Sequence, residues 1–126
     1  GEVWSPNVVK VVCDRGGDAL YFSRSPIPYF RQAWRGKTPG ETPPGDEAPV
    51  LAHLGVYGFA RQALFDFTAL SPGALERAES LEQLRALEAG WRIRVIQSVS
   101  TKSIGVDRPE DVSRAEAALR QRLGRA

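Results

Sequence analysis

Two runs of β-branched and aromatic residues near the start of the chain constrain its fold most strongly. The first is Val8 to Cys13 and the second is Ala19 to Ser23, with the polar, glycine-containing segment Asp14 to Asp18 between them. This pattern predicts a β-hairpin with a five-residue loop. Alternation of apolar and polar residues predicts further strands over Leu51 to Tyr57 and Arg92 to Val99.

Helical patterns alternate with these strands. Phe59 to Leu70 is predicted to form a short, mostly apolar helix. Ser71 and Pro72 signal the start of a second helix, which carries leucines every third residue and ends at Gly90. A last helix is expected to begin at Asp107, where an acidic residue three positions on completes a capping box. Alternating strands and helices predict an α/β fold with a layered sheet.

The charge balance argues against several classes of binding protein. Among 126 residues, 17 Lys and Arg stand against 15 Asp and Glu, which gives a net charge of +2. A nucleic-acid or membrane-surface binder usually carries a strong basic patch. We therefore expect neither nucleic acid nor a membrane among the partners.

The amino-acid composition also indicates where in the cell the protein is located. The single cysteine, Cys13, cannot form an internal disulfide, and its apolar run predicts an inert core thiol. No segment reaches the length of a membrane span or has the pattern of a signal peptide. We expect a soluble cytoplasmic protein, and the absence of Met leads us to expect a fragment of a longer one.

Several polar residues are candidates for a binding site. His53 and Tyr57 would share one face of their strand with Gly55 between them, which leaves room for a ligand. The alternative is a half-buried histidine beside a tyrosine at the sheet edge, and the pattern alone favours it. Arg24, at a strand end, suits a carboxylate or phosphate, although most such arginines are solvated.

A series of acceptors follows the second helix. Glu76, Glu79 and Glu82 recur at three-residue spacing, with Gln83 beside the last. Such glutamates usually form surface ion pairs, but Glu82 and Gln83 fall nearest the buried middle and could line a site. Asp107 is explained by helix capping alone, yet its carboxylate also suits Mg²⁺ at a sheet edge.

The segment from Pro26 to Pro49 is rich in Pro and Gly and has no sustained period, so it is predicted to be a long loop. Its aromatic half, around Tyr29 and Trp34, could pack against a second subunit. The stretch from Lys37 to Ala48 is expected to be its most mobile part.

Five segments together resemble a known family. They read PNVVKVVCD, ALYFSRSPIP, HLGVYGF, ALERAESLEQLRALEAG and GVDRPEDV, and they cover nearly the whole chain. Their order and spacing resemble the C-terminal half of the CMP-Kdo synthetases, the 3-deoxy-manno-octulosonate (Kdo) cytidylyltransferases. The resemblance implies a fold of the nucleotide-diphospho-sugar transferase type, with a mixed sheet flanked by helices, of which residues 1–126 would form the C-terminal portion of a single domain.

The resemblance also implies a function. The family couples CTP with Kdo to give CMP-Kdo and pyrophosphate for lipopolysaccharide assembly, and it looks like a homodimer joined through this half. On matching positions, the implied Kdo contacts are Arg24, His53, Tyr57, Glu82 and Gln83. Asp107 is the implied catalytic residue, as a ligand of Mg²⁺.

Two departures and two alternatives remain. The family is about twice as long and begins with a loop that holds the CTP phosphates, so this chain alone is expected to be inactive and to expose an apolar sheet edge. The alternatives are a cytidylyltransferase for another acidic sugar, such as a sialic acid, and a non-catalytic dimerisation homologue.

Overall fold

The structure, a computed structural model, divides into two compact units, Gly1–Ile96 and Gln97–Ala126. It describes residues 2–36 and 50–98, together with residues 109, 112, 113, 115–117 and 120. The loop residues 37–49 and Asp107 lie outside the described residues. Among those described, no helix is long and apolar enough to cross a membrane.

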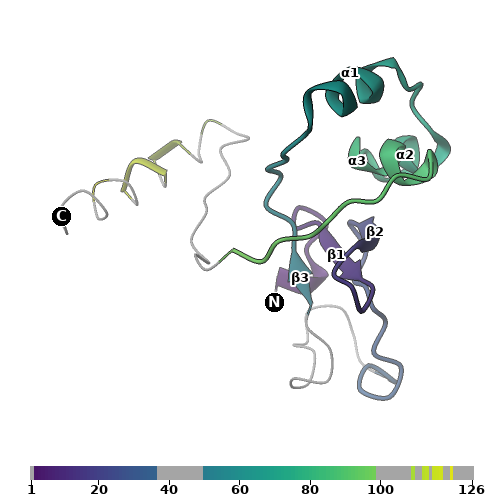
Figure 1. The fold of residues 1–126 in the computed structure, drawn as a ribbon. Helices are drawn as coiled ribbons and strands as arrows, with labels where there is room; N and C mark the ends of the chain where they lie inside the picture. The colour runs from purple at the N-terminus through teal and green to yellow at the C-terminus, as the bar shows by residue number, and fades with distance from the viewer. Residues whose placement is uncertain are drawn as a thin grey trace. The chain divides into compact units, whose positions relative to one another are not determined.

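The predicted hairpin is confirmed. Strand β1 (Lys10–Cys13) pairs antiparallel with β2 (Ala19–Ser23), and Val11 lies opposite Phe22 (Figure 1). The loop is closed by two bonds, from Asp14 N–H to the Asp18 carbonyl at 2.8 Å and from Asp18 N–H to the Asp14 carboxylate at 2.9 Å.

The third strand is shorter than predicted. Strand β3 covers only Leu51–Ala52 and pairs antiparallel with β1, so the sheet order is β2-β1-β3. The prediction of a strand as far as Tyr57 is wrong because Gly55 adopts a φ of +67°, which ends the extended backbone. The strand pairs of the described residues are all antiparallel, so the parallel part of the expected mixed sheet is not among them.

The predicted strand from Arg92 is reduced to a short contact with the hairpin. Ala19 N–H donates to the Ile93 carbonyl at 2.8 Å, and Val95 N–H donates to the Gly17 carbonyl at 3.0 Å. Because the segment meets only the hairpin end of β2, it forms one isolated bridge, between Asp18 and Arg94, instead of a strand.

The helices follow the sheet. A one-turn 3-10 helix, η1 (Glu2–Trp4), opens the chain, and the predicted apolar helix is confirmed as α1 (Arg61–Ala69). The second predicted helix is two helices, α2 (Ala74–Glu79) and α3 (Gln83–Glu88). The prediction of one continuous helix is wrong because Ser80 takes a left-handed φ of 53°.

The start of α2 also differs from the expected serine and proline signal. Its N-cap is Gly73, and the Glu88 carboxylate of α3 accepts from Leu75 N–H at 3.1 Å and Glu76 N–H at 3.3 Å. A Cβ atom at Gly73 would displace that carboxylate, so the cap depends on glycine there. Helix α2 therefore begins where a second helix caps it.

The core lies between the hairpin and the two short helices. It is formed by Val11, Ala19 and Phe22 from the strands and by Leu81 and Leu84 from the helical region. Leu84 is fully buried, which fixes α3 against the sheet. This packing sets the position of the residues that begin α3.

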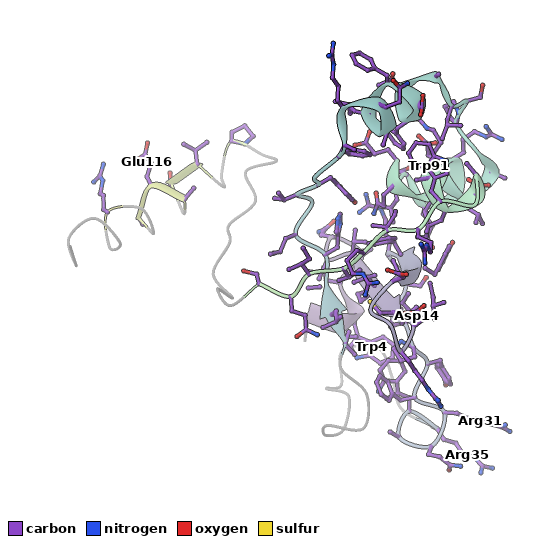
Figure 2. All side chains as sticks on the ribbon, viewed as in Figure 1. Trp4, Asp14, Arg31, Arg35, Trp91 and Glu116 are labelled. Carbon is purple, nitrogen blue, oxygen red and sulfur yellow. The ribbon has the colours of Figure 1, made fainter. Side chains whose placement is uncertain are left out.

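Of the aromatic residues of the long loop, Trp34 packs inside the chain, whereas Tyr29 is 65% exposed. Trp34 is only 2% exposed, and its ring lies 4.5 Å from that of Trp4 and 4.9 Å from that of Phe30. Arg31 and Arg35 point outward from the same segment (Figure 2). Trp34 is thus covered by its own chain, where the sequence had left open a contact with a second subunit.

Candidate functional site

The structure brings His53 and Tyr57 together, through a turn instead of a strand. His53 N–H donates to the Val9 carbonyl at 2.9 Å, which holds its backbone beside β1. The left-handed Gly55 then turns the chain so that the Tyr57 hydroxyl lies 2.6 Å from His53 Nε2. The two side chains therefore form one hydrogen-bonded unit.

This unit is electrically neutral at physiological pH. Burial lowers the pKa of His53, and burial together with the negative charge of Glu82 raises the pKa of Tyr57. Either the phenol donates to Nε2, or Nε2–H donates to the phenol oxygen. In both arrangements the pair offers a ligand hydrogen bonds, but no positive charge.

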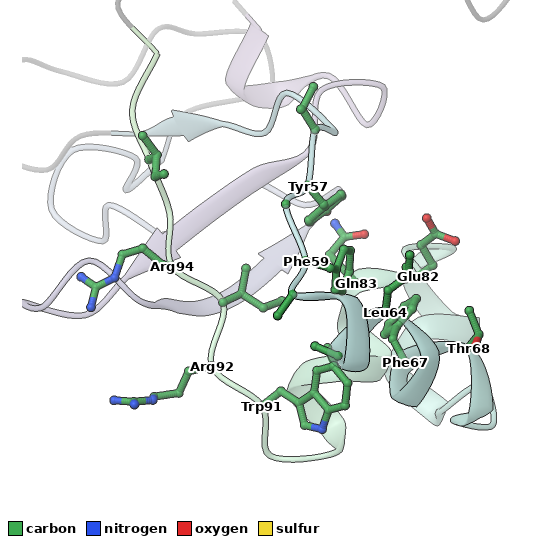
Figure 3. A pocket seen from close by; sticks show the side chains of 17 residues that line it. Tyr57, Phe59, Leu64, Phe67, Thr68, Glu82, Gln83, Trp91, Arg92 and Arg94 are labelled. Atoms are coloured by element: carbon green, nitrogen blue, oxygen red, sulfur yellow. The ribbon is translucent and has the colours of Figure 1, made fainter.

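A pocket of about 650 Å³ lies beside this pair. Its walls come from residues 56–60, from α1 and α3, and from the segment after α3. Figure 3 shows Tyr57, Glu82 and Gln83 toward one end of the pocket and Trp91 toward the other. Three residues selected from the sequence thus share one cavity.

Gln83 is the least expected polar group of the pocket. The residue is only 6% exposed, and its side-chain Nε2 has no hydrogen-bond partner among the described residues. A buried amide without a partner costs on the order of 1–3 kcal/mol. Gln83 begins α3, and its side chain lines the pocket.

The rest of the pocket wall is mostly apolar. Phe67 lies with its ring 5.6 Å from that of Phe59 and 6.3 Å from that of Trp91. Arg94, at the pocket edge, is engaged by the Asp18 carboxylate at 2.9 Å and by the Gly16 carbonyl. An apolar wall with a few convergent polar groups is typical of sites for small molecules.

Arg24 does not line this pocket. Its guanidinium donates to three backbone carbonyls, those of Glu79 at 2.8 Å, Pro6 at 3.0 Å and Ser80 at 3.3 Å. A guanidinium has five N–H donors, so two remain after these bonds. The side chain is therefore held in place with limited capacity left for a ligand.

Two further residues surround Arg24. Sequence reasoning missed Lys10 and named Glu79 only as one of three spaced acceptors. The Glu79 carboxylate accepts from Arg24 N–H at 2.9 Å and from Ser23 Oγ at 2.6 Å. Lys10 is fully buried, and its ammonium donates to the Ser5 carbonyl at 2.9 Å and the Val8 carbonyl at 2.6 Å, as well as to that of Arg24. A lysine inside a run of valines was the available signal, because alternation places it on a buried face.

Glu76, the first of the three spaced glutamates, is a structural residue. Arg85 donates to its carboxylate from Nη2 at 2.6 Å and from Nε at 2.8 Å. This is the ion pair that the sequence pattern usually indicates. Of the three glutamates, only Glu82 lines the pocket.

The described residues contain no group of three or more His, Cys, Asp or Glu side chains that could hold a metal ion. Asp107, the expected ligand of Mg²⁺, lies outside them. Among the described residues that line the pocket, Glu82 is the one carboxylate, so these residues do not form a Mg²⁺ site by themselves.

Comparison with known proteins agrees with the expected family. A family model described as "Cytidylyltransferase" matches residues 1–102. The chain is 49% identical to a 3-deoxy-manno-octulosonate cytidylyltransferase of Pelobacter propionicus, over 92% of this chain and 45% of that protein. It is also 49% identical to a relative of the same name in Xylella fastidiosa, over 94% of this chain and 44% of that protein.

A solved structure of a related protein supports the same family. The structure of CMP:2-keto-3-deoxy-manno-octonic acid synthetase complexed with CTP matches with a TM-score of 0.79 and 40% identity, and the match covers 96% of this chain and 45% of that one. The α/β nucleotidyltransferase-like fold expected from the sequence is thereby confirmed. The chain spans less than half the length of these relatives. On the family match, the chain belongs to the cytidylyltransferase family.

Proposed function

We propose that this chain forms the sugar-binding part of a cytidylyltransferase that couples CTP with Kdo to give CMP-Kdo and pyrophosphate. The observation that carries the proposal is the pocket that Tyr57, Glu82 and Gln83 share, in which a buried Gln83 amide has no partner among the described residues. A sugar hydroxyl entering the pocket would give that amide its missing hydrogen bond.

The polar groups suit an acidic, hydroxyl-rich sugar. Glu82 can accept from a sugar hydroxyl, and Gln83 can donate to one. The neutral His53 and Tyr57 pair adds further hydrogen bonds. Arg24 is assigned to the sugar carboxylate, through the N–H groups that its backbone contacts leave available.

In this reaction the anomeric oxygen of the sugar attacks the α-phosphorus of CTP, and the bond to the leaving pyrophosphate breaks. The contribution of this chain is to bind and orient the sugar, because transfer to phosphorus depends mainly on position and charge neutralisation. Asp107 stays the proposed catalytic carboxylate as a Mg²⁺ ligand, since a hard oxygen donor is what this ion prefers. The metal would neutralise charge on the phosphates.

Further parts of the proposal concern the cell. The product would feed lipopolysaccharide assembly, and the protein would act in the cytoplasm, where CTP and Mg²⁺ are available. We propose a homodimer as the assembly. A net charge of +2 supports the absence of nucleic acid from the partners.

Pyrophosphate release tests the proposal directly. We would assay CTP, Kdo and Mg²⁺ with this chain and with the longest natural polypeptide that contains it, and with a sialic acid in place of Kdo. Release with Kdo by the longer polypeptide supports the proposal. Release only with the sialic acid, or no release by folded protein, contradicts it.

A variant then tests the pocket. Gln83→Ala is expected to raise the KM for Kdo about tenfold, because the lost hydrogen bond belongs to a buried group. The KM for CTP should stay unchanged. Gln62→Ala is the matched control, because that amide is exposed on α1 and bonds only to Asp66 at 2.9 Å. Equal effects on both substrates would count against a sugar site.

A further inference from the structure

Lys10 is an unusual residue for the centre of a small sheet. Its side chain is fully buried, and its ammonium donates to three backbone carbonyls, of Ser5, Val8 and Arg24. Burial of a lysine is costly, and buried charges can often be replaced by apolar side chains without loss of stability. The three bonds use all the donors of the ammonium. They tie the segment before β1 to the residue that follows β2.

Glu79 makes the complementary set of contacts from the end of α2. One carboxylate oxygen accepts from Ser23 Oγ at 2.6 Å, and the other accepts from Arg24 N–H at 2.9 Å. Burial raises the pKa of Glu79, but the bonds from Ser23, Arg24 and Tyr21 outweigh it and lower the pKa overall. Glu79 is therefore ionised, and its backbone carbonyl also accepts from the Arg24 guanidinium at 2.8 Å.

These contacts converge on one residue. The N–H of Arg24 is held by the Glu79 carboxylate, its carbonyl by the Lys10 ammonium, and its guanidinium by the carbonyl of Glu79. Backbone and side chain of Arg24 are thus fixed from both sides by two ionised residues. Neither ionised side chain lines the pocket.

We propose that Lys10 and Glu79 are positioning residues that fix Arg24 for the carboxylate of the sugar acid, and that they thereby set the preference for the acid over its neutral ester. The inference rests on the proposed function, in which Arg24 contacts that carboxylate. A preorganised guanidinium loses less side-chain entropy when the carboxylate binds. An arginine free to move would bind the acid more weakly while leaving the neutral ester unaffected.

The test compares Kdo with its methyl ester in pyrophosphate release by the longest natural polypeptide that contains this chain. The measured quantity is the ratio of kcat/KM for the acid to that for the ester. Arg24→Met is expected to lower this ratio by about tenfold or more, through loss of a charge-assisted bond. Lys10→Met and Glu79→Gln are expected to lower it at least threefold, with the KM for CTP unchanged.

Glu76→Gln is the matched control, because it is the same substitution on the same helix but weakens the ion pair with Arg85 and no contact with Arg24. It should leave the ratio unchanged. Circular dichroism shows whether Lys10→Met and Glu79→Gln fold. If they do not, Ser23→Ala is the variant that tests the inference. That variant removes one bond of the Glu79 carboxylate and should lower the ratio in the same direction.

Three results would overturn the inference, and each has a different meaning. No release from Kdo by the unsubstituted, folded protein removes the proposed function itself. An unchanged ratio in Arg24→Met removes the carboxylate contact. A lowered ratio in Arg24→Met, with an unchanged ratio in every folded variant of Lys10, Glu79 and Ser23, leaves the function intact and shows that the two ionised residues serve stability alone.

Discussion

Burial of His53 couples the stability of the protein to pH. Its pKa lies below the ordinary value of 6.5 because desolvation disfavours the imidazolium. Between the lowered pKa and 6.5, the unfolded chain binds more protons than the folded one. The folded state is favoured while His53 is neutral. This contribution to the free energy of unfolding is therefore fully present above pH 6.5 and is lost as the pH falls toward the folded-state pKa.

Urea unfolding at a series of pH values tests this. The free energy of unfolding should fall between about pH 7.5 and about pH 5.5, a window in which carboxyl groups titrate little. His53→Gln should remove most of this dependence on pH, while its amide keeps a polar group of similar size near Tyr57. An equal slope in both proteins would mean that another group is responsible.

At the level of residues, sequence reasoning reached part of the site. Tyr57, Glu82 and Gln83 were selected and do share a pocket. Lys10 was not selected, and Glu79 was named only as one of three spaced acceptors. The role of Glu79 depends on partners about 55 positions away, Ser23 and Arg24, which no local pattern reveals. Arg24 was selected too, but the sequence could not predict its bonds to the carbonyls of Pro6, Glu79 and Ser80, and it does not line the pocket.

The helix pair α2 and α3 depends on one carboxylate. Glu88 accepts from the N–H groups of Leu75 and Glu76, which would otherwise lack partners at the start of α2. Glu88→Ala should lower the free energy of unfolding by about 1 kcal/mol, as removal of a helix cap does. Asp66→Ala on α1 is the control, because within the described part of the chain that carboxylate bonds only to an exposed Gln62 side chain. Equal losses in the two variants would contradict a capping role.

Helices and strands could be predicted from the sequence where neighbouring residues alone determine them. The hairpin and α1 follow from composition and periodicity. The prediction of one continuous helix was wrong because Ser80 takes a left-handed conformation, in which its carbonyl accepts from Arg24. Strand Leu51 to Tyr57 failed because Gly55 serves a turn that brings Tyr57 to His53, and alternation cannot distinguish a turn glycine from a strand glycine.

For the molecule as a whole, the pocket rim exposes large apolar side chains among the described residues. Val56 is 87% exposed and Ile96 is 86% exposed, and both line the same cavity. Exposed apolar groups that gather in one place favour association. This rim differs from the exposed sheet edge expected from the sequence, because Val56 and Ile96 lie outside the strands.

Sedimentation velocity over a range of protein concentrations tests whether this surface drives self-association. We expect a concentration-dependent increase in sedimentation coefficient for the unsubstituted chain, because association removes apolar area from water at roughly 25 cal/mol per Å². The double variant Val56→Lys and Ile96→Lys should shift the chain toward monomer. Leu20→Lys is the control, since Leu20 is 62% exposed on β2 but does not line the pocket. A compact monomer at all concentrations, or equal effects of the control and the double variant, would show that the rim does not drive association.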